Sequence, residues 1–585
     1  MGLSKDSSLW HSNQLKAKLL KSSIARVSLL AGASLLVVLP FLWWGIPSGH
    51  DFEFHMFSWM EVLGQWKQGI LYPRWAALAH WGYGEARFLF YPPASWTLGA
   101  ALGAILPWTL VPGTYCWLAI TLAAASMYRL AREWLDPADA LFAAIFYALN
   151  PYHLLIVYWR SAYAELLAAA LLPLLVLCLL RVYDPKSGSR PSLRPTLWLS
   201  LTLAAAWLTN APAAVMIHYS AAGLALLLAI MLVLREGRSG PIWRPLLQTA
   251  AAVLLGAGLA SFYLLPAIYE QHWINLAEVL SPGVRPQDNF LFTTIADADH
   301  NRFNDLVSTV ALFEIAALLL AVVFSYLSRA KRATSSGRMP WKLLSAWGLA
   351  TVIVMLSVSN PLWLYLPKFR FIQLPFRWLL CMNAALALLL TISTRRWLSR
   401  SFIFLILLAA VIVAGYRIQP PWWDNNDDVS EMRDAVAAGS GSGYEGTDEY
   451  VPVGADAYEL NKDQPRITDA SGSPLPIKVL AWLPTEKHFT THSPATQNVT
   501  VRLFSYPAWE VLVNDQVTFT EKTPVTGLII IPISAGDSDV RIRFRWTADR
   551  EIGDAVSLLS LIVFIIIWLR TRRHPSAQIH HGLPA

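Results

Sequence analysis

The sequence predicts a mainly α-helical, polytopic membrane protein with a small β-sandwich before its last helix. Of its 585 residues, 55% are hydrophobic and only 15% are charged, and the mean hydropathy is +0.42. Several apolar runs of about 18 or more residues are long enough to cross a ~30 Å hydrocarbon core. Toward the C-terminus the pattern changes to short alternating segments, which are typical of strands. We therefore expect about twelve or thirteen transmembrane helices and one domain outside the bilayer.

The chain begins with a basic segment, residues 1–25, in which several lysines precede an apolar run from Val27 to Gly45. A signal peptide would be followed by an Ala-x-Ala-like cleavage site, and none follows this run. The run is therefore predicted to be an uncleaved first span. Positive charge ahead of a span indicates a cytoplasmic N-terminus.

A multi-span domain is expected over residues 26–416, with its first outer loop at 46–93. Basic clusters recur in every second loop, which places those loops and both ends of the chain in the cytoplasm. Residues 94–112 are expected to be re-entrant or interfacial, because the hairpin formed by 114–131 and 138–157 leaves no place for another crossing. The further expected spans are 161–181, 196–212, 213–234, 245–267, 306–328, 341–358, 376–394, 402–416 and 555–570.

The composition changes after this domain. An acidic region rich in Gly and Ser predicts a linker. The alternation that follows, for example at Asn498–Phe504, and an Asn514-Asp515 turn predict a small antiparallel sandwich on the outer face. The expected division is a linker at 417–477, the outer sandwich at 478–553, the last transmembrane helix at 554–571 and a cytoplasmic tail at 572–585.

An acidic, histidine-containing stretch follows the first span: Pro47-Ser-Gly-His-Asp-Phe-Glu-Phe-His55. It places Asp51, Glu53, His50 and His55 at the outer membrane surface. On a strand, Asp51, Glu53 and His55 would share one side; on a helix, Asp51 and His55 would share a face. In either form the acids could ligate a divalent cation or hold a catalytic base beside a partner. The alternative interpretation is a set of solvated loop residues.

A second candidate is Tyr158-Trp-Arg-Ser-Ala-Tyr-Ala-Glu165, where Arg160 and Glu165 enter an apolar span from the outer side. A carboxylate about one turn inside a span is costly, so Glu165 should face a cavity and be paired. The alternatives are a purely structural Arg160–Glu165 pair and side chains that extend to the interface.

Basic side chains also occur on the outer side, where the positive-inside rule predicts few. They are Arg74, Arg87, Arg160, Lys368, Arg370 and Arg377. A lipid phosphate or diphosphate would explain them, because a guanidinium binds phosphate oxygens bidentately. Pairing with protein carboxylates or with lipid headgroups is the other explanation.

Several functional classes are disfavoured by the motifs that the sequence lacks. It has no P-loop, no G-x-G-x-x-G after a strand, no H-E-x-x-H and no G-x-S-x-G. This argues against nucleotide-driven transport and soluble-donor chemistry, and leaves an activated lipid donor or an ion gradient as the energy source. The net charge of +7 comes mostly from residues that flank spans, so nucleic acid is not an expected partner. Cys116, Cys178 and Cys381 lie in apolar segments and form neither a disulfide framework nor a metal-ligand pattern.

Blocks of residues in a fixed order resemble a bacterial membrane-protein family. They are Gly49-His-Asp51, Phe54-His55, Tyr72-Pro-Arg-Trp75, Tyr91-Pro-Pro93, Arg160–Glu165, Ser261–Glu270 and Gln373–Trp378. This family is known by the label "6-pyruvoyl-tetrahydropterin synthase-related" membrane domain. The label is not taken literally, because the sequence lacks the three-histidine zinc spacing of a pterin synthase. The tail Tyr506–Asp515 is similar to the Tyr-Pro-Gly-Trp element of YfhO-like outer domains, with alanine in place of the glycine.

The resemblance implies an architecture similar to type C glycosyltransferases, such as protein O-mannosyltransferases and aminoarabinose transferases. It implies a polyprenyl-phosphate-linked sugar as donor, a glycan, lipid or protein as acceptor, and membrane lipids around a site at the outer face of the bacterial cytoplasmic (inner) membrane. Asp51 would be the base that deprotonates the acceptor, Glu53 a metal ligand or auxiliary acid, and Glu165 the second acid of the cavity. Substrate would contact His50, His55, Arg74, Arg160, Arg370 and Arg377. Asp51 and Glu53 would hold Mg²⁺ or Mn²⁺, the one candidate cofactor.

The alternative function is that of a non-enzymatic membrane protein that binds or moves a lipid or a cell-surface polymer. Its sandwich would then be a partner- or glycan-binding module. A transporter would show related halves and broken helices at the membrane midplane. The sequence shows no internal repeat, which favours the transferase.

Overall fold

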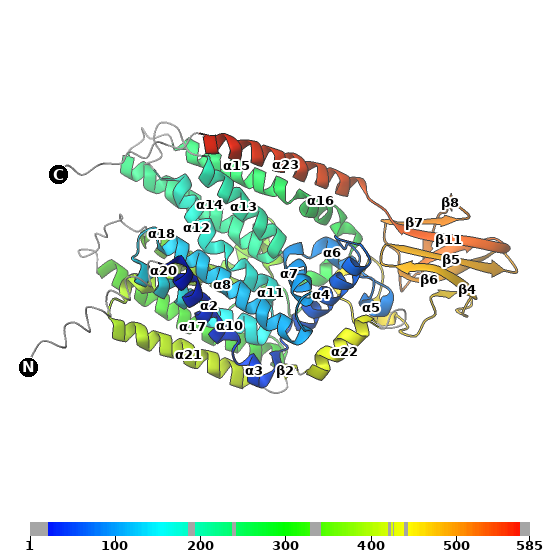
Figure 1. Cartoon of the computed structure of the whole chain (residues 1–585), viewed down its shortest axis with the longest axis horizontal. Helices are drawn as coiled ribbons and strands as arrows, with labels where there is room; N and C mark the ends of the chain where they lie inside the picture. Colours follow the sequence, from blue (N-terminus) through cyan, green and yellow to red (C-terminus); the bar gives the residue numbers. More distant parts are fainter. Residues whose placement is uncertain are drawn as a thin grey trace, which may run out of the picture.

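The computed structural model describes residues 22–184, 193–236, 242–327, 341–418, 423–424, 426–437 and 443–573. It has a large helical body with a β domain at one end (Figure 1). The helices α2 (Ser23–Val38) and α23 (Ala548–Arg573) respectively begin and end at the opposite end of the body. The predicted cytoplasmic segments at the two ends of the chain lie almost wholly outside the described residues.

Nine helices within the described ranges are long and apolar enough to cross a membrane. They are Ser23–Trp44, Trp108–Ala131, Pro137–Arg160, Tyr163–Val182, Ala211–Leu234, Ala298–Leu327, Pro375–Ser393, Trp397–Arg417 and Ala548–Thr571. Two further pairs pass the same test together but bend, Trp243–Leu259 with Ser261–Trp273 by 77° and Trp341–Val354 with Ser357–Tyr365 by 90°. The predicted polytopic helical fold is thus confirmed, with nine to eleven candidate spans.

The expected count of twelve or thirteen exceeds this because the predicted span 196–212, and the segment 94–112 that would make a thirteenth, form short helices. α13 (Arg194–Thr209) has 16 residues and α7 (Pro93–Gly103) has 11. At 1.5 Å per residue these helices are about 24 Å and 16 Å long, less than the ~30 Å hydrocarbon core. The short α7 agrees with the expectation that residues 94–112 do not cross.

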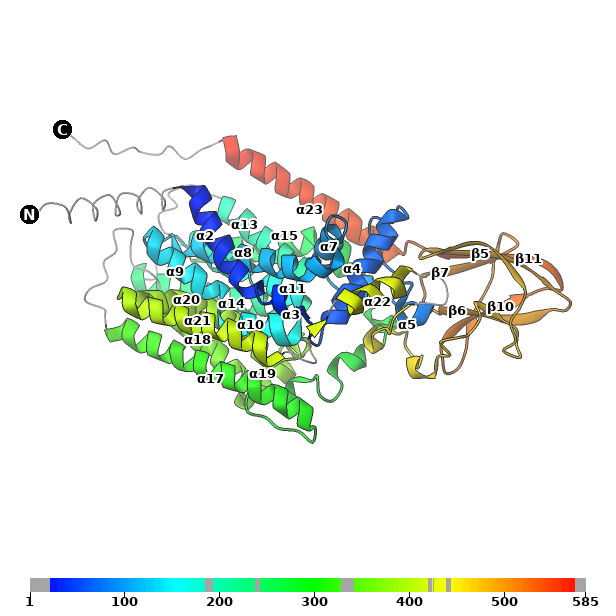
Figure 2. The same cartoon turned by 60° about the horizontal axis from the view of Figure 1, so that its bottom comes forward.

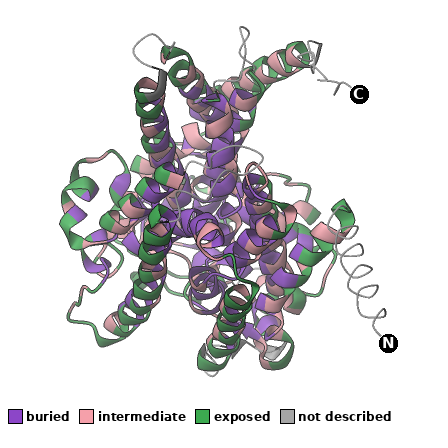
Figure 3. Ribbon diagram, turned by 90° about the vertical axis from the view of Figure 1, so that its left-hand side faces the viewer, coloured by how far each residue is buried: buried purple, intermediate pink, exposed green. Residues whose placement is uncertain are grey.

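Burial separates central helices from peripheral ones. In the spans Pro137–Arg160 and Pro375–Ser393, 83% of the most apolar stretch is buried, against 17% in α21 (Trp397–Ile418) and 6% in α23. Figure 3 shows the buried residues gathered in the middle of the body and the exposed ones around it. Figure 2 places α23 and α17 (Ala298–Leu327) on opposite edges. Exposed leucines and isoleucines on such peripheral helices are what a lipid-facing surface requires.

A layer of short elements lies between the helical body and the β domain. It contains α4 (Phe52–Lys67), α5 (Ala79–Gly82), α6 (Arg87–Phe90) and α22 (Asn426–Ala437) (Figure 1). The strand β1 (Ile46–Pro47) before α4 pairs with β2 (Trp423–Asp424), which brings the start of the first outer loop to the end of α21.

The β domain is a sandwich of two antiparallel sheets, as the alternating pattern predicts. One sheet has the order β3 (Ile467–Thr468), β6 (Gln497–Phe504), β10 (Leu528–Ile533) and β9 (Glu521–Lys522). The other has the order β4 (Ile477–Leu483), β5 (Glu486–Ser493), β11 (Gly536–Phe544), β7 (Trp509–Val513) and β8 (Gln516–Val517). Phe489, Val501 and Val540 are fully buried between the sheets. Asn514 and Asp515 have φ of 51° and 61° and connect β7 to β8, so the predicted turn is confirmed.

A buried ion pair holds the start of α23, the helix that directly follows the β domain, against α16 (Ser261–Glu270). Arg550, in the first turns of α23, donates hydrogen bonds of 2.7 and 2.8 Å to the two carboxylate oxygens of Glu270, at the end of α16. The Tyr506 hydroxyl, just before β7, donates to the same carboxylate at 2.5 Å. Because a bidentate guanidinium–carboxylate contact fixes orientation as well as distance, it sets the position of the sandwich.

Candidate active site

The start of α4 lies against the segment Trp159–Ser161 through backbone contacts. The Asp51 amide donates to the carbonyl of Arg160 at 2.9 Å, and the Gly49 amide donates to the Ser161 hydroxyl at 2.9 Å. A Cβ at position 49 would lie 2.3 Å from the carbonyl oxygen of Trp159. Only glycine allows this approach, so the predicted first outer loop and the third long span are held together at Asp51.

The partner segment has an irregular backbone. Residues Ile156–Arg160 form a π-helix, and Ser161 after it has φ of 49°. The Ser161 hydroxyl also donates to the carbonyl of Pro47 at 2.9 Å. π-Bulges and left-handed non-glycine residues are enriched at functional sites. Here they turn Arg160 toward Asp51.

Four charged side chains converge at this point. Arg160 donates to Glu165 at 2.6 Å (Nη1 to Oε2), and Arg377 donates to the same oxygen at 3.1 Å through Nε. Asp51 Oδ2 lies 4.0 Å from Arg160 Nη2. The Asp51 side chain is 40% exposed, whereas those of Arg160 and Glu165 are 2% and 1% exposed. Asp51 is therefore the accessible acid of a cluster whose other members are buried.

The charges of this cluster balance. Two guanidiniums face Glu165, which leaves one positive charge in excess, and Asp51 compensates it. Asp51 is the N-cap residue of α4, but its carboxylate makes no capping hydrogen bond. A negative charge is favourable at this position, because the helix dipole is positive there.

Sequence reasoning did not find three further buried polar residues behind Glu165. Tyr152 donates to Glu165 Oε1 at 2.5 Å through its hydroxyl and to Glu314 Oε1 at 3.1 Å through its amide. Asn383 donates to Glu314 Oε2 at 2.9 Å. The one available signal was Glu314, a single carboxylate inside the apolar run 306–328, because such residues are rare and usually functional or paired.

The two histidines lie in different surroundings. His55 is 1% exposed and is enclosed by rings, including those of Trp59, Tyr91 and Tyr163. Burial lowers the pKa of His55 to about 4, so it is neutral at neutral pH. The ring of His50 packs edge-on to Phe303 at 4.8 Å; His50 is exposed, and the surrounding protein lowers its pKa by partial desolvation of the ring.

Glu53 does not join Asp51. The segment is a helix, not a strand, so Asp51 and His55 share a face while Glu53, two residues on, is turned by about 200°. Glu53 is exposed. Among the described residues no three His, Cys, Asp or Glu side chains converge as ligands of a cation. With Arg160 beside Asp51, the donor set does not fit Mg²⁺ or Mn²⁺.

Two of the predicted arginines lie elsewhere. Arg74 stacks over the ring of Trp546 at 4.3 Å, near the start of α23. Arg370 is exposed and lies over Phe371 at 5.3 Å. The structure thus brings Arg160 and Arg377 to the Asp51 cluster, and it does not bring Arg74 or Arg370 into contact with it.

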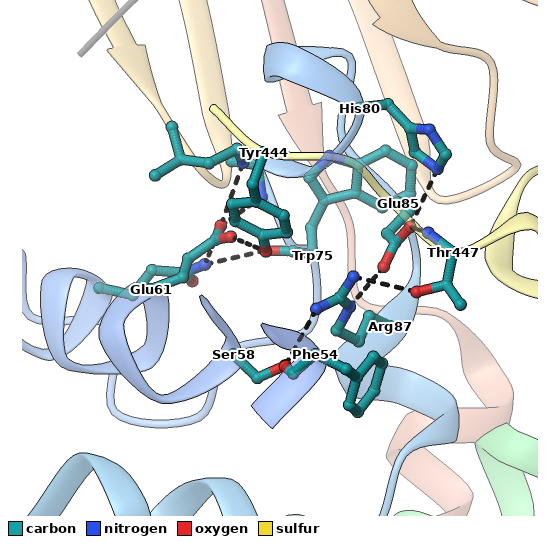
Figure 4. Close-up of polar contacts among 12 residues, drawn as sticks. Phe54, Ser58, Glu61, Trp75, His80, Glu85, Arg87, Tyr444 and Thr447 are labelled. Atoms are coloured by element: carbon teal, nitrogen blue, oxygen red, sulfur yellow. Dashed lines mark hydrogen bonds and ion pairs between the residues drawn. The ribbon is translucent and has the colours of Figure 1, made fainter. Parts of the chain in front are cut away.

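A second buried network connects α4 to the segment that precedes the sandwich (Figure 4). Glu85 is paired with Arg87 and lies 3.0 Å from His80. Arg87 donates to the hydroxyls of Ser58 and Thr447 at 3.0 Å. Burial alone would raise the pKa of Glu85, but the charge of Arg87 and the contact with His80 hold it below its usual value. For Arg87, pairing with a protein carboxylate is therefore the observed explanation.

The same network includes Glu61, which lies about one turn after Ser58 on α4. Its carboxylate accepts hydrogen bonds from the amide of Ala77 at 2.5 Å and from the Tyr444 hydroxyl at 2.6 Å. Burial raises the pKa of Glu61. All of its close partners are donors within the chain, so Glu61 serves to hold the segment around Tyr444 against α4.

Comparisons with solved structures give an arabinofuranosyltransferase and an oligosaccharyltransferase at low similarity. An arabinofuranosyltransferase AftD from Mycobacteria is 17% identical, with a TM-score of 0.40 over 68% of this chain and 27% of that one. The apo oligosaccharyltransferase of Archaeoglobus fulgidus is 16% identical, with a TM-score of 0.40 over 69% of this chain and 57% of that one. The chain thus spans between about a quarter and just over half of the length of these proteins. A search of the curated proteins gives no match.

Among family models, that of the 6-pyruvoyl-tetrahydropterin synthase related domain of membrane proteins matches residues 88–419. The matched region is more than half of the 585 residues and includes Arg160, Glu165 and Arg377. Asp51 precedes it, and is tied to it through the backbone contacts at Trp159–Ser161. The resemblance of the tail to YfhO-like domains stays a prediction. The chain belongs to the 6-pyruvoyl-tetrahydropterin synthase related family of membrane proteins.

Proposed function

We propose that this protein is a membrane glycosyltransferase that moves a sugar from a polyprenyl-phosphate donor to an acceptor hydroxyl at the outer face of the cytoplasmic membrane. The observation on which this rests is the position of Asp51. It is a partly exposed carboxylate next to Arg160, on a buried cluster that also holds Glu165 and Arg377. A base within reach of solvent and two guanidiniums within the same cluster are the groups that this transfer needs. The donor class follows from the sequence resemblance.

The proposed reaction uses Asp51 as general base. Its carboxylate takes the proton of the acceptor hydroxyl while that oxygen attacks the anomeric carbon. The bond between this carbon and the phosphate oxygen breaks, and polyprenyl phosphate leaves with the electron pair. When Asp51 is protonated, the cluster of Arg160, Arg377 and Glu165 keeps one uncompensated positive charge. This charge would stabilise the negative charge that develops on the leaving phosphate.

The division of roles explains why Glu165 is buried. Glu165 would not exchange protons with substrate; it holds Arg160 and Arg377 in place, because both donate to its Oε2. Positioning of this kind requires that the partner groups are themselves fixed, and the Tyr152 hydroxyl fixes the other oxygen of Glu165. No step is assigned to a metal ion, since the donor set does not fit one.

The test is the variant Asp51→Asn, which keeps the shape of the side chain and removes the base. We expect glycan product in membranes that contain this variant to fall by about 10²–10⁴-fold, the usual contribution of a general base. Asp299→Asn, at an exposed carboxylate in the first turn of α17, should form product as the wild type does. Gel filtration and thermal unfolding in detergent would show that both variants fold. Product formation by Asp51→Asn at the wild-type rate would refute the catalytic role of Asp51.

A further inference from the structure

A cavity of about 290 Å³ lies between the first outer loop and the sandwich. One wall is formed by α4, through Glu61 and Gln65, and by the turn that contains Trp81. The opposite wall belongs to the sandwich and includes Trp482 and Lys487. The cavity is separate from the Asp51 cluster, because Glu61 lies about 15 Å further along the axis of α4 than Asp51.

Three cations line this cavity without an ion-pair partner among the described residues: Arg466, Lys487 and Arg502. Lys487 is only 4% exposed and donates to the carbonyl of Leu483 at 2.5 Å. Arg502 is 7% exposed; its terminal nitrogens donate to backbone carbonyls, while its Nε has no partner. Buried cations are normally paired, so this arrangement points to an anion supplied from outside the chain.

Among the described residues that line the cavity, the only carboxylate already has hydrogen-bond donors of its own. Glu61 accepts hydrogen bonds from the amides of Ala77 and Leu78 and from the hydroxyl of Tyr444. It therefore does not neutralise Lys487 by a direct contact. Burial lowers the pKa of Lys487 to about 7, the charge of Glu61 opposes this, and the charge of Arg466 adds to it. A bound anion would offset the free-energy cost of burying the ammonium group of Lys487.

The remaining groups indicate what else the ligand would carry. The Gln65 amide nitrogen donates to the carbonyl of Trp75 at 2.9 Å and to Glu61 at 3.2 Å, which fixes the orientation of the amide. The amide oxygen of Gln65 is buried and accepts no hydrogen bond. The indole of Trp482 lies beside Arg466 and Lys487, 4.9 and 5.4 Å from the ring centre. The wall thus combines cations, an aromatic ring and a free acceptor.

We propose that this cavity binds an acidic sugar, with its carboxylate or phosphate on Lys487 and Arg466 and a hydroxyl donating to Gln65 Oε1. The acid group accounts for the cations, and the hydroxyl accounts for the free amide oxygen. The volume is at the lower limit of ordinary ligand pockets, which hold about 300–1,000 Å³, so it suits one sugar unit. The site would let the outer domain hold an anionic glycan next to α4, the helix that has Asp51 at its N-terminal end.

The test is calorimetric titration of the full-length protein in detergent with glucuronate, glucose 6-phosphate, glucose and inorganic phosphate. We expect at least one of the two acidic sugars to bind, and Lys487→Met and Arg466→Gln to weaken it by about tenfold or more, the loss of one charge-assisted hydrogen bond. Arg543→Gln, at a half-exposed arginine of the same domain, should bind as the wild type does. Glucuronate and glucose 6-phosphate distinguish a carboxylate from a phosphate as the recognised group.

Three results would overturn the proposal: no binding of either acidic sugar, equal binding of glucose or of inorganic phosphate, or undiminished binding by both variants. Arg466 is only partly buried, so Arg466→Gln gives a usable result even if Lys487→Met fails to fold. Asp51→Asn should bind the acidic sugar normally. The binding proposal and the proposed catalytic function can therefore fail independently.

Discussion

The carbonyl of Arg160 accepts a 2.9 Å hydrogen bond from the amide of Asp51, and the side chains of the same two residues approach to 4.0 Å. Asp51 and Arg160 are thus held together both through their backbones and through their side chains. This contact sets the distance between the accessible acid and the buried cations, and it depends on the absence of a side chain at position 49.

Gly49→Ala is expected to disturb this contact. The added Cβ would lie 2.3 Å from the carbonyl oxygen of Trp159, so the loop must shift and Asp51 with it. Because a displacement of about 1 Å can lower a rate by about 10²-fold, glycan product should fall by about that factor in a membrane assay. Gly32→Ala is the matched control, since a Cβ there meets nothing within 4 Å. Unchanged activity of Gly49→Ala would show that the loop is not held at this point.

Glu165→Gln should destabilise the protein. It leaves two buried guanidiniums, of Arg160 and Arg377, with only the partly exposed Asp51 carboxylate 4.0 Å from Arg160, and breaking a buried ion pair costs about 3–5 kcal/mol. Thermal unfolding in detergent would measure this as a lower midpoint. The double variant Glu165→Gln/Arg377→Gln should recover part of the loss, because it removes one of the unpaired charges. A double variant that is less stable than the single variant would contradict this account.

The Glu270–Arg550 contact should control the attachment of the sandwich. Glu270→Gln leaves Arg550 buried without its counter-charge, and we expect a loss of about 3–5 kcal/mol. Tyr506→Phe removes one hydrogen bond to the same carboxylate and should cost about 0.5–1.5 kcal/mol. Limited proteolysis between the helical body and the sandwich would report both. If the two variants were cleaved equally fast, the ion pair would not be the main attachment.

The pKa of His55 predicts a pH dependence of stability. Its folded pKa is about 4 against an ordinary value of 6.5, so between these values the unfolded state takes up a proton that the folded state does not. Stability should therefore fall as the pH falls from 6.5 to 4, by up to about 3 kcal/mol from this group. His55→Phe lacks this titration and should lose less stability than the wild type over that window. The prediction would be contradicted if unfolding scans between pH 6.5 and pH 4 showed the same loss of stability for the wild type and for His55→Phe.

Much of the fold follows from periodicity. Apolar runs predict the spans, and alternation predicts the sandwich with its Asn514-Asp515 turn, because both patterns are local. The Arg160–Glu165 pair was also within reach of local reasoning. Local pattern could not decide whether residues 50–55 form a strand or a helix, and the helix is what separates Glu53 from Asp51.

The rest of the site depends on residues far apart in the sequence. Arg377 meets Glu165 across 212 positions, and Tyr444 meets Glu61 across 383. Contacts between such distant residues leave no periodic pattern in the sequence. An excess of arginines in the predicted outer loops likewise does not show which of them come together in one cluster. The sequence around Gly49 likewise did not show that a side chain is excluded at this position, since the carbonyl that excludes a Cβ belongs to Trp159 in another span.

The Glu270–Arg550 contact also has a consequence for biogenesis. The two residues lie 280 positions apart, so at translation rates of about 5–20 residues per second Arg550 leaves the ribosome on the order of tens of seconds after Glu270. Throughout that interval the nascent chain holds an unpaired carboxylate at the end of a membrane helix. Glu270 must meanwhile stay hydrated or take up a proton, and the sandwich can be fixed in place only when the final helix has been inserted.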